Sequence, residues 1–391
     1  MDLFDTLATI CKTAAFALGR ELAAWRPSRA RASFGAQAVL SVGLSVVLAN
    51  ALNLQNTWWA AISGFAVMET SFPASVRRAI HRMLGTLAGA LLGTIVGPLI
   101  GDRPLLVVLA LGLIGGTGVY RANGSKAAYA WVLGAVTALM VTYEAHGLVS
   151  IKSTASFAAL RVAEVAVGTL ACVLVAGLFH VGAKIESKGR VPVGSASAGE
   201  LEESEPQSAS VAPPAFESLR PARSLLGLQA GLAVAILAAF SYLWHLPGFA
   251  QAMVTAIAVL ILPSTVLAAQ ARRPIVERMV QRVAGCLFAG ALGVALLPLT
   301  QGRAVLCIVA LSVGVWIGCH VQTGREGASY VGRQFTIAFI MVFVQDHHWS
   351  ADPVPALMRL CGILSGIVVL AGVLAATSGR PRSRGDARAV G

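Results

Sequence analysis

The stretch that decides the fold is Arg78–Leu99, RAIHRMLGTLAGALLGTIVGPL, which recurs as Arg278–Leu299, RMVQRVAGCLFAGALGVALLPL. Each copy begins with two arginines one helical turn apart and continues with an apolar helix rich in small residues, which we expect to stop at a proline. Arg78 and Arg82 fall in register with Arg278 and Arg282 without a gap, as do two glycines, three leucines and the proline. Such an internal repeat indicates two related halves.

The composition excludes a soluble protein. The chain has 391 residues, of which 56% are hydrophobic and only 12% are charged, whereas soluble domains carry about 25% charged residues. Many apolar runs approach the roughly 20 residues that a helix needs to cross a bilayer, and they lack the period-two alternation of barrel strands. We therefore predict an all-α polytopic membrane protein, and we attribute the net charge of +12 to cytosolic loops rather than to a nucleic-acid partner.

The predicted organisation is two parallel six-helix repeats, with about 12 transmembrane helices in total. A cytosolic amphipathic segment (1–33) precedes the first repeat (34–181), a disordered cytosolic linker (182–223) precedes the second repeat (224–377), and a basic cytosolic tail (378–391) follows. The expected spans are 34–53, 57–72, 83–100, 105–120, 127–145, 157–181, 224–243, 249–268, 283–299, 304–320, 331–346 and 354–377.

Lysine and arginine placement predicts the orientation. With both termini in the cytoplasm, all but five of the 30 Lys and Arg residues lie on the cytosolic side; the five are Arg103, Lys152, Arg161, Arg303 and Arg359. This bias is the positive-inside pattern. An even number of spans in each half makes the halves parallel, and binding sites in such folds lie between the halves.

Several motifs resemble the fusaric acid resistance (FUSC) family. Trp58 and Trp59 enter a short helix, Pro73 follows, and the pattern Arg-x3-Arg-x2-Gly-Thr-Leu-x-Gly starts at Arg78. Arg161-x2-Glu-x3-Gly resembles the element that closes the family's membrane half. In the second half the pattern departs, because Cys286 replaces the threonine and Gly362 replaces the glutamate.

The resemblance implies a function. Members of the family resemble inner-membrane exporters of aromatic carboxylic acids and are distantly similar to plant malate channels. We expect an efflux transporter of small aromatic or hydrophobic organic acids that is proton-coupled, in the bacterial inner membrane. A passive organic-anion channel is the alternative, followed by a non-transporting membrane protein or an enzyme. The resemblance also implies a periplasmic adaptor protein, and a homo-oligomer stays open. We expect no enzymatic activity, cofactor, metal or nucleic acid.

Four repeated arginines are the first candidates for the anion path: Arg78, Arg82, Arg278 and Arg282. A guanidinium group can hold a carboxylate through two hydrogen bonds. The alternative is that these arginines only mark the cytosolic side of the membrane. The repetition fits both interpretations.

Charged residues within the apolar spans are further candidates. Glu69 and Glu164 are the candidates for proton coupling, because a carboxylate at membrane depth is costly unless it has a function. Glu69 could instead be a solvated residue at the interface. Arg161 can pair with Glu164 three residues away, and Arg359 is its counterpart without that glutamate. Both arginines are placed in the anion path.

Three aromatic residues and one arginine near the start of two spans could stack on an aromatic substrate. These are Tyr129 and Trp131 in the first half, with Tyr330 and Arg333 in the second. Their position is the only basis for this assignment.

Overall fold

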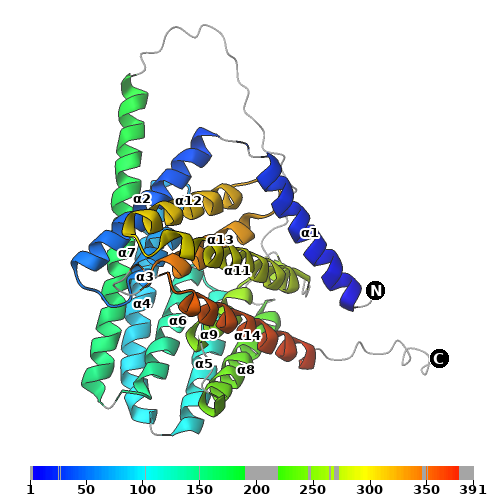
Figure 1. Cartoon of the computed structure of the whole chain (residues 1–391). Coiled ribbons are helices and arrows are strands. Elements are labelled where there is room, and N and C mark those ends of the chain that lie inside the picture. Colours follow the sequence, from blue (N-terminus) through cyan, green and yellow to red (C-terminus); the bar gives the residue numbers. More distant parts are fainter. Residues whose placement is uncertain are drawn as a thin grey trace, which may run out of the picture.

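The structure is a computed structural model that describes residues 3–24, 26, 28–101, 103–148, 150–189, 219–244, 248–263, 266–267, 273–345, 349 and 351–377. Within these residues all regular elements longer than a turn are α-helices (Figure 1). They are α1 (Leu3–Ala24), α2 (Arg29–Ala51), α3 (Thr57–Ala66), α4 (Phe72–Ile100), α5 (Pro104–Ala122), α6 (Ala128–Ala145), α7 (Ile151–Gly189), α8 (Arg220–Trp244), α9 (Phe249–Val259), α11 (Arg273–Thr300), α12 (Ala304–Gln322), α13 (Ser329–Phe343) and α14 (Val354–Ala376).

The structure supports the polytopic membrane class. In the described part of the chain, nine helices are long and apolar enough to cross a membrane. Helices also form in the other three predicted spans, but α3, α9 and α13 have only 10, 11 and 15 residues. At about 1.5 Å per residue they are shorter than the roughly 30 Å hydrocarbon core. Twelve crossings and two parallel six-helix repeats therefore stay a prediction.

Equivalent helices make equivalent contacts in the two halves. The pair α4 and α6 corresponds to α11 and α13, and the pair α3 and α7 corresponds to α9 and α14. The first helix of each half packs on the other half, so that α2 contacts α12 and α8 contacts α5 (Figure 1). The largest buried apolar clusters consequently mix residues from both halves. The two repeats share their cores and are not separate domains.

Small residues allow α4 to approach α6 closely. A Cβ atom added at Gly85 would lie 2.3 Å from the carbonyl oxygen of Ala130, and one added at Gly89 would lie 2.2 Å from that of Gly134. In the second half, a Cβ atom at Gly285 would lie 2.7 Å from the carbonyl oxygen of Val331. Membrane helices commonly use small residues at such contacts, because lipid tails supply no hydrophobic drive for helix association. This contact fixes which face of α6 points toward the centre.

Some boundaries differ from the predicted ones. The helix α7 continues to Gly189 and α8 begins at Arg220, so both ends of the predicted linker are helical. The remaining linker (190–218) and the tail (378–391) lie outside the described residues. Pro98 and Pro298 lie inside α4 and α11 rather than ending them, because proline removes one backbone donor without preventing the next residues from staying helical.

The N-terminal helix α1 packs against α11 and α12. Its residue Glu21 accepts hydrogen bonds from Arg31 on α2 and, at 3.1 Å, from the backbone amide of Glu326. Arg31 also donates to the carbonyl of His320. Burial acts to raise the pKa of Glu21, but the hydrogen bonds from Arg31 and Glu326 outweigh it and lower the pKa below 4.5. These contacts tie α1 to the connection between α12 and α13.

Candidate functional site

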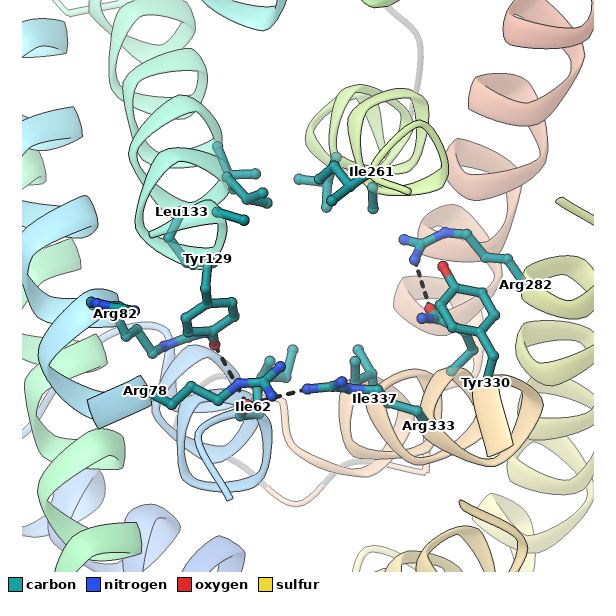
Figure 2. Close-up of a pocket in the computed structure, with 18 of the residues that line it drawn as sticks. Ile62, Arg78, Arg82, Tyr129, Leu133, Ile261, Arg282, Tyr330, Arg333 and Ile337 are labelled. Carbon is teal, nitrogen blue, oxygen red and sulfur yellow. Dashed lines mark hydrogen bonds between the residues drawn. The ribbon is translucent and has the colours of Figure 1, made fainter. Parts of the chain in front are cut away.

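A cavity of about 1010 Å³ lies between the two halves. Residues of α3, α4 and α6 form one wall, and residues of α9, α11 and α13 form the other. Figure 2 shows Arg78, Arg82 and Tyr129 on one side, with Arg282 and Tyr330 facing them across the space. The cavity is large enough for a small organic molecule, since ligand pockets typically measure about 300–1,000 Å³.

The side chain of Arg82 is buried in the first wall, where α4 packs on α6. Its Nη1 atom donates to the Tyr129 hydroxyl at 2.7 Å, and its Nη2 atom donates to Ser63 Oγ at 2.8 Å. Arg82 is only 3% exposed. A buried charge needs such partners, because desolvation without them costs several kcal/mol per ion. Arg82 thus positions Tyr129 against the short helix α3.

Arg282 occupies the corresponding place in the second wall. Its Nε atom donates to Thr255 Oγ1 at 3.2 Å, and its Nη1 atom donates to Gln334 Oε1 at 2.6 Å. Thr255 therefore corresponds to Ser63 of the first half. The tyrosine partner is replaced by Gln334, which lies on α13 as Tyr129 lies on α6.

Arg78 and Arg278 also line the cavity and are less buried than Arg82 and Arg282. Arg78 forms an ion pair with Glu69, and its Cζ atom lies 4.5 Å from the centre of the Tyr129 ring. Arg278 donates instead to the backbone carbonyl of Ile261, and its Cζ atom lies 5.6 Å from the centre of the Tyr330 ring. The two walls thus differ at this point, because a carboxylate partners the arginine in the first wall only.

The early ends of α3 and α9 leave backbone carbonyl groups at the cavity. The last four carbonyls of a helix have no partner within the helix. Ala66, the last residue of α3, accepts a hydrogen bond from Arg333 Nη2 at 3.4 Å and one from the Tyr129 hydroxyl at 3.5 Å. Arg333 lies close enough to Arg78 for the two charges to interact (Figure 2). Helices that end within a membrane protein are typical of transporter binding sites.

Both cationic and apolar side chains line the cavity. Among the described residues that line it, Glu69 is the only carboxylate, and seven residues are cationic: Arg77, Arg78, Arg82, Lys126, Arg278, Arg282 and Arg333. Ile62, Leu133 and Ile337 line the apolar part (Figure 2). Guanidinium groups beside apolar side chains fit an anion that carries a hydrophobic body.

Two tryptophans and two arginines meet beside the cavity. Trp58 and Trp59 line it. The Cζ atom of Arg359 lies 4.7 Å from the centre of the Trp58 ring, and that of Arg161 lies 4.5 Å from the centre of the Trp59 ring. Cation–π contacts of this kind stabilise both groups. Arg161 and Arg359 therefore do not line the cavity themselves but support the indoles that do.

Glu164 lies outside the cavity lining and is fully buried. It pairs with Arg161 at 3.0 Å, as the sequence predicted, and accepts hydrogen bonds from the backbone and side-chain amides of Asn56 at 3.0 and 3.1 Å. These donors surround the carboxylate and connect α7 to the start of α3. The arrangement is that of a structural ion pair.

Trp131 lies on another face of α6 than Tyr129. It is 42% exposed and borders a second, apolar groove between α4, α5 and α6, and it does not line the central cavity. Two positions on a helix that are two residues apart do not share a face. By contrast, Tyr330 and Arg333, which are three residues apart on α13, both line the cavity.

Several residues of the site were not among the sequence candidates. Ser63, Thr255 and Gln334 bind the buried arginines, yet serine, threonine and glutamine are common in membrane helices. Only the repeat could have singled out Gln334, because its first-half counterpart is the apolar Leu133. A polar residue in one half at a position that is apolar in the other half is the signal that could have identified Gln334.

Comparison with known proteins agrees with the geometry. Residues 44–175 match the family model described as fusaric acid resistance protein-like, and this region contains the whole first wall of the cavity. No curated protein and no solved structure matches the chain. Residues 44–175 therefore resemble the fusaric acid resistance (FUSC) family, in agreement with the motifs around Arg78 and Arg161, which lie inside the matched region.

Proposed function

We propose that this chain is a secondary transporter that exports small aromatic or hydrophobic organic acids across the bacterial inner membrane, with both termini in the cytoplasm. The observation that carries the proposal is the pair of arginine clusters on opposite walls of one cavity between the two halves. The FUSC family match and the long apolar helices support a transporter of organic anions.

The proposed binding mode places the carboxylate of the substrate between Arg78, Arg333 and Arg278. These arginines are half-buried, so their guanidinium groups are accessible, whereas Arg82 and Arg282 are buried and already bonded. The hydrophobic part of the substrate then contacts the apolar residues between the walls and stacks on the tyrosine rings. In this proposal Arg82 and Arg282 are positioning residues.

Glu69 is the proposed proton-coupling residue. It pairs with Arg78 and remains 34% exposed, so water can exchange its proton. A substrate carboxylate that binds Arg78 displaces Glu69, and the released carboxylate can then take up a proton. Arg77, Arg78, Arg82 and Lys126 line the same wall as Glu69, with Arg333 opposite and His81 beside them. Glu164 is less suited to this role, because it is fully buried and already bonded to Arg161 and Asn56.

The excess of cationic side chains also supports the alternative, a passive organic-anion channel. Reconstituted vesicles distinguish the two. We expect radiolabelled hydroxybenzoate to accumulate against its gradient when a proton gradient is imposed, beyond the level in protein-free vesicles, and to be lost when the gradient is collapsed. An anion current that follows the voltage without proton coupling would show that the protein is a channel and not an exporter. Absence of any protein-dependent flux, for a panel of aromatic and aliphatic acids, would contradict both.

A further inference from the structure

The second apolar groove of the molecule has no role in the proposed transport. It has a volume of about 430 Å³ and lies between α4, α5 and α6, on the side of α6 that faces away from the central cavity. The groove opens on the apolar surface of the molecule, where Leu84 is 58% and Leu113 is 71% exposed. In a membrane this surface faces lipid.

The internal repeat shows that this groove is specific to the first half. In the repeat register, Ala88 of the groove corresponds to Phe288. The equivalent contacts of Gly93 with Val141 and of Gly293 with Val342 set the register of α6 against α13. In that register, Gly134 and Ala138 of the groove correspond to Phe335 and Phe339. The three phenylalanine rings form a ladder in the second half, with ring centres 5.4 Å apart at each step. Phe339 fills the space against α12 so closely that a Cβ atom at Gly314 would lie 2.0 Å from its ring. One half therefore fills with its own side chains the space that the other half leaves open.

Cationic and aromatic groups lie at one end of the groove. Trp131 lines this end, and the Cζ atom of Arg121 lies 5.6 Å from the centre of its ring. Arg121 is exposed and lies in the last turn of α5. Tryptophan is enriched at the level of lipid headgroups, and exposed basic residues at the membrane surface attract anionic lipids.

We propose that this groove is a binding site for one anionic phospholipid. An acyl chain lies in the apolar slot along α6, and the headgroup phosphate binds Arg121. A second copy of the chain fits less well, because a helix with its side chains is about 10–12 Å wide and would cover the slot rather than enter it. A bound lipid would support α6 from behind, opposite the cavity side that carries Tyr129.

The repeat also supplies the test variant. Ala88→Phe places in the groove the residue that the second half carries at Phe288. Native mass spectrometry of the whole purified chain with added phosphatidylglycerol should show one retained lipid on the wild type and at least tenfold weaker retention on Ala88→Phe. Arg121→Gln should weaken retention about fivefold, since each basic residue at the surface contributes about that factor. Ile95→Phe on α4 and Arg103→Gln, at the N-cap of α5, lie outside the groove and should leave lipid retention unchanged.

Several results would overturn the proposal. If the protein retains phosphatidylcholine as well as phosphatidylglycerol, Arg121 does not recognise an anionic headgroup. If the wild type and Ala88→Phe retain phosphatidylglycerol equally, the acyl chain does not lie in this groove. A change of oligomeric state in Ala88→Phe without lipid loss would assign the groove to a second copy. If Ala88→Phe fails to fold, brominated phosphatidylglycerol should quench wild-type fluorescence more than that of Trp131→Phe, and equal quenching would refute the site.

Discussion

Glu69 provides the sharpest prediction, because it competes with the proposed substrate for Arg78. In Glu69→Gln the side chain keeps its size and loses its charge, so the substrate anion no longer has to displace a carboxylate. Arg78 and Glu69 are 20% and 34% exposed, which places their pair near the upper end of surface ion pairs, at ~1 kcal/mol. Removing this competition should tighten anion binding about fivefold at pH 7.

Isothermal titration of the purified protein with an aromatic sulfonate measures this effect, since the sulfonate stays ionised in acid while carboxylic acids do not. The advantage of Glu69→Gln should shrink as acid protonates Glu69 in the wild type, which removes the same charge. Uphill transport should be lost in the variant while exchange down a gradient remains. Glu277→Gln serves as the control, because Glu277 pairs with Arg273 on the exposed face of α11, away from the cavity.

Two outcomes would refute this reasoning. Weaker anion binding in Glu69→Gln would mean that Glu69 organises the site rather than competes with the substrate. An advantage that persists unchanged in acid would mean that the charge of Glu69 is not the cause.

Three further predictions test other parts of the structure. Arg82→Gln should weaken anion binding at least tenfold, because hydrogen bonds to a charged group contribute ~1.5–3 kcal/mol each, and Arg82→Lys should restore only part of it; titration checks both. Gly89→Leu should lower the melting temperature in detergent by several degrees, because its Cβ atom would meet a backbone oxygen of α6 at 2.2 Å, whereas Gly43→Ala, with nothing within 4 Å, should not. The docking of α1 should be lost as the pH falls below 4.5 and through the lowered pKa of Glu21, because protonation removes the charge that Arg31 and the amide of Glu326 stabilise in the folded state. Hydrogen exchange of α1 across this pH range measures the loss, and Glu21→Gln should expose α1 already at pH 7.

Periodic and compositional signals predicted the helices well but not where some of them end. Apolar runs predicted spans over 57–72 and 249–268, yet α3 ends at Ala66 and α9 at Val259. Hydrophobicity reports burial, and a buried stretch can be irregular where it borders a cavity. Pro263 was an available signal in the second case, because the residue before a proline is disfavoured in a helix.

The sequence likewise predicted some residues of the site and not others. The repeat alone brought together Arg78, Arg82, Arg278 and Arg282, because equivalent positions in two related halves face one central space. The contacts of Arg161 with Trp59 and of Arg359 with Trp58 depend on the tertiary arrangement of α7 and α14 around α3, which no local pattern encodes. Helix geometry by itself separates Trp131 from Tyr129, because positions two residues apart point to different faces.

The central claim is that arginines from both halves form one anion site. Equilibrium binding of a radiolabelled aromatic carboxylate to the purified protein tests it most directly, with Arg78→Gln and Arg278→Gln made separately and together. Each change should weaken binding at least about fivefold, which corresponds to the loss of one ion pair of ~1 kcal/mol. The double change should weaken binding further, while Arg303→Gln at the start of α12, outside the cavity lining, should leave it unchanged. Equal affinity in the wild type and the double variant would contradict the account.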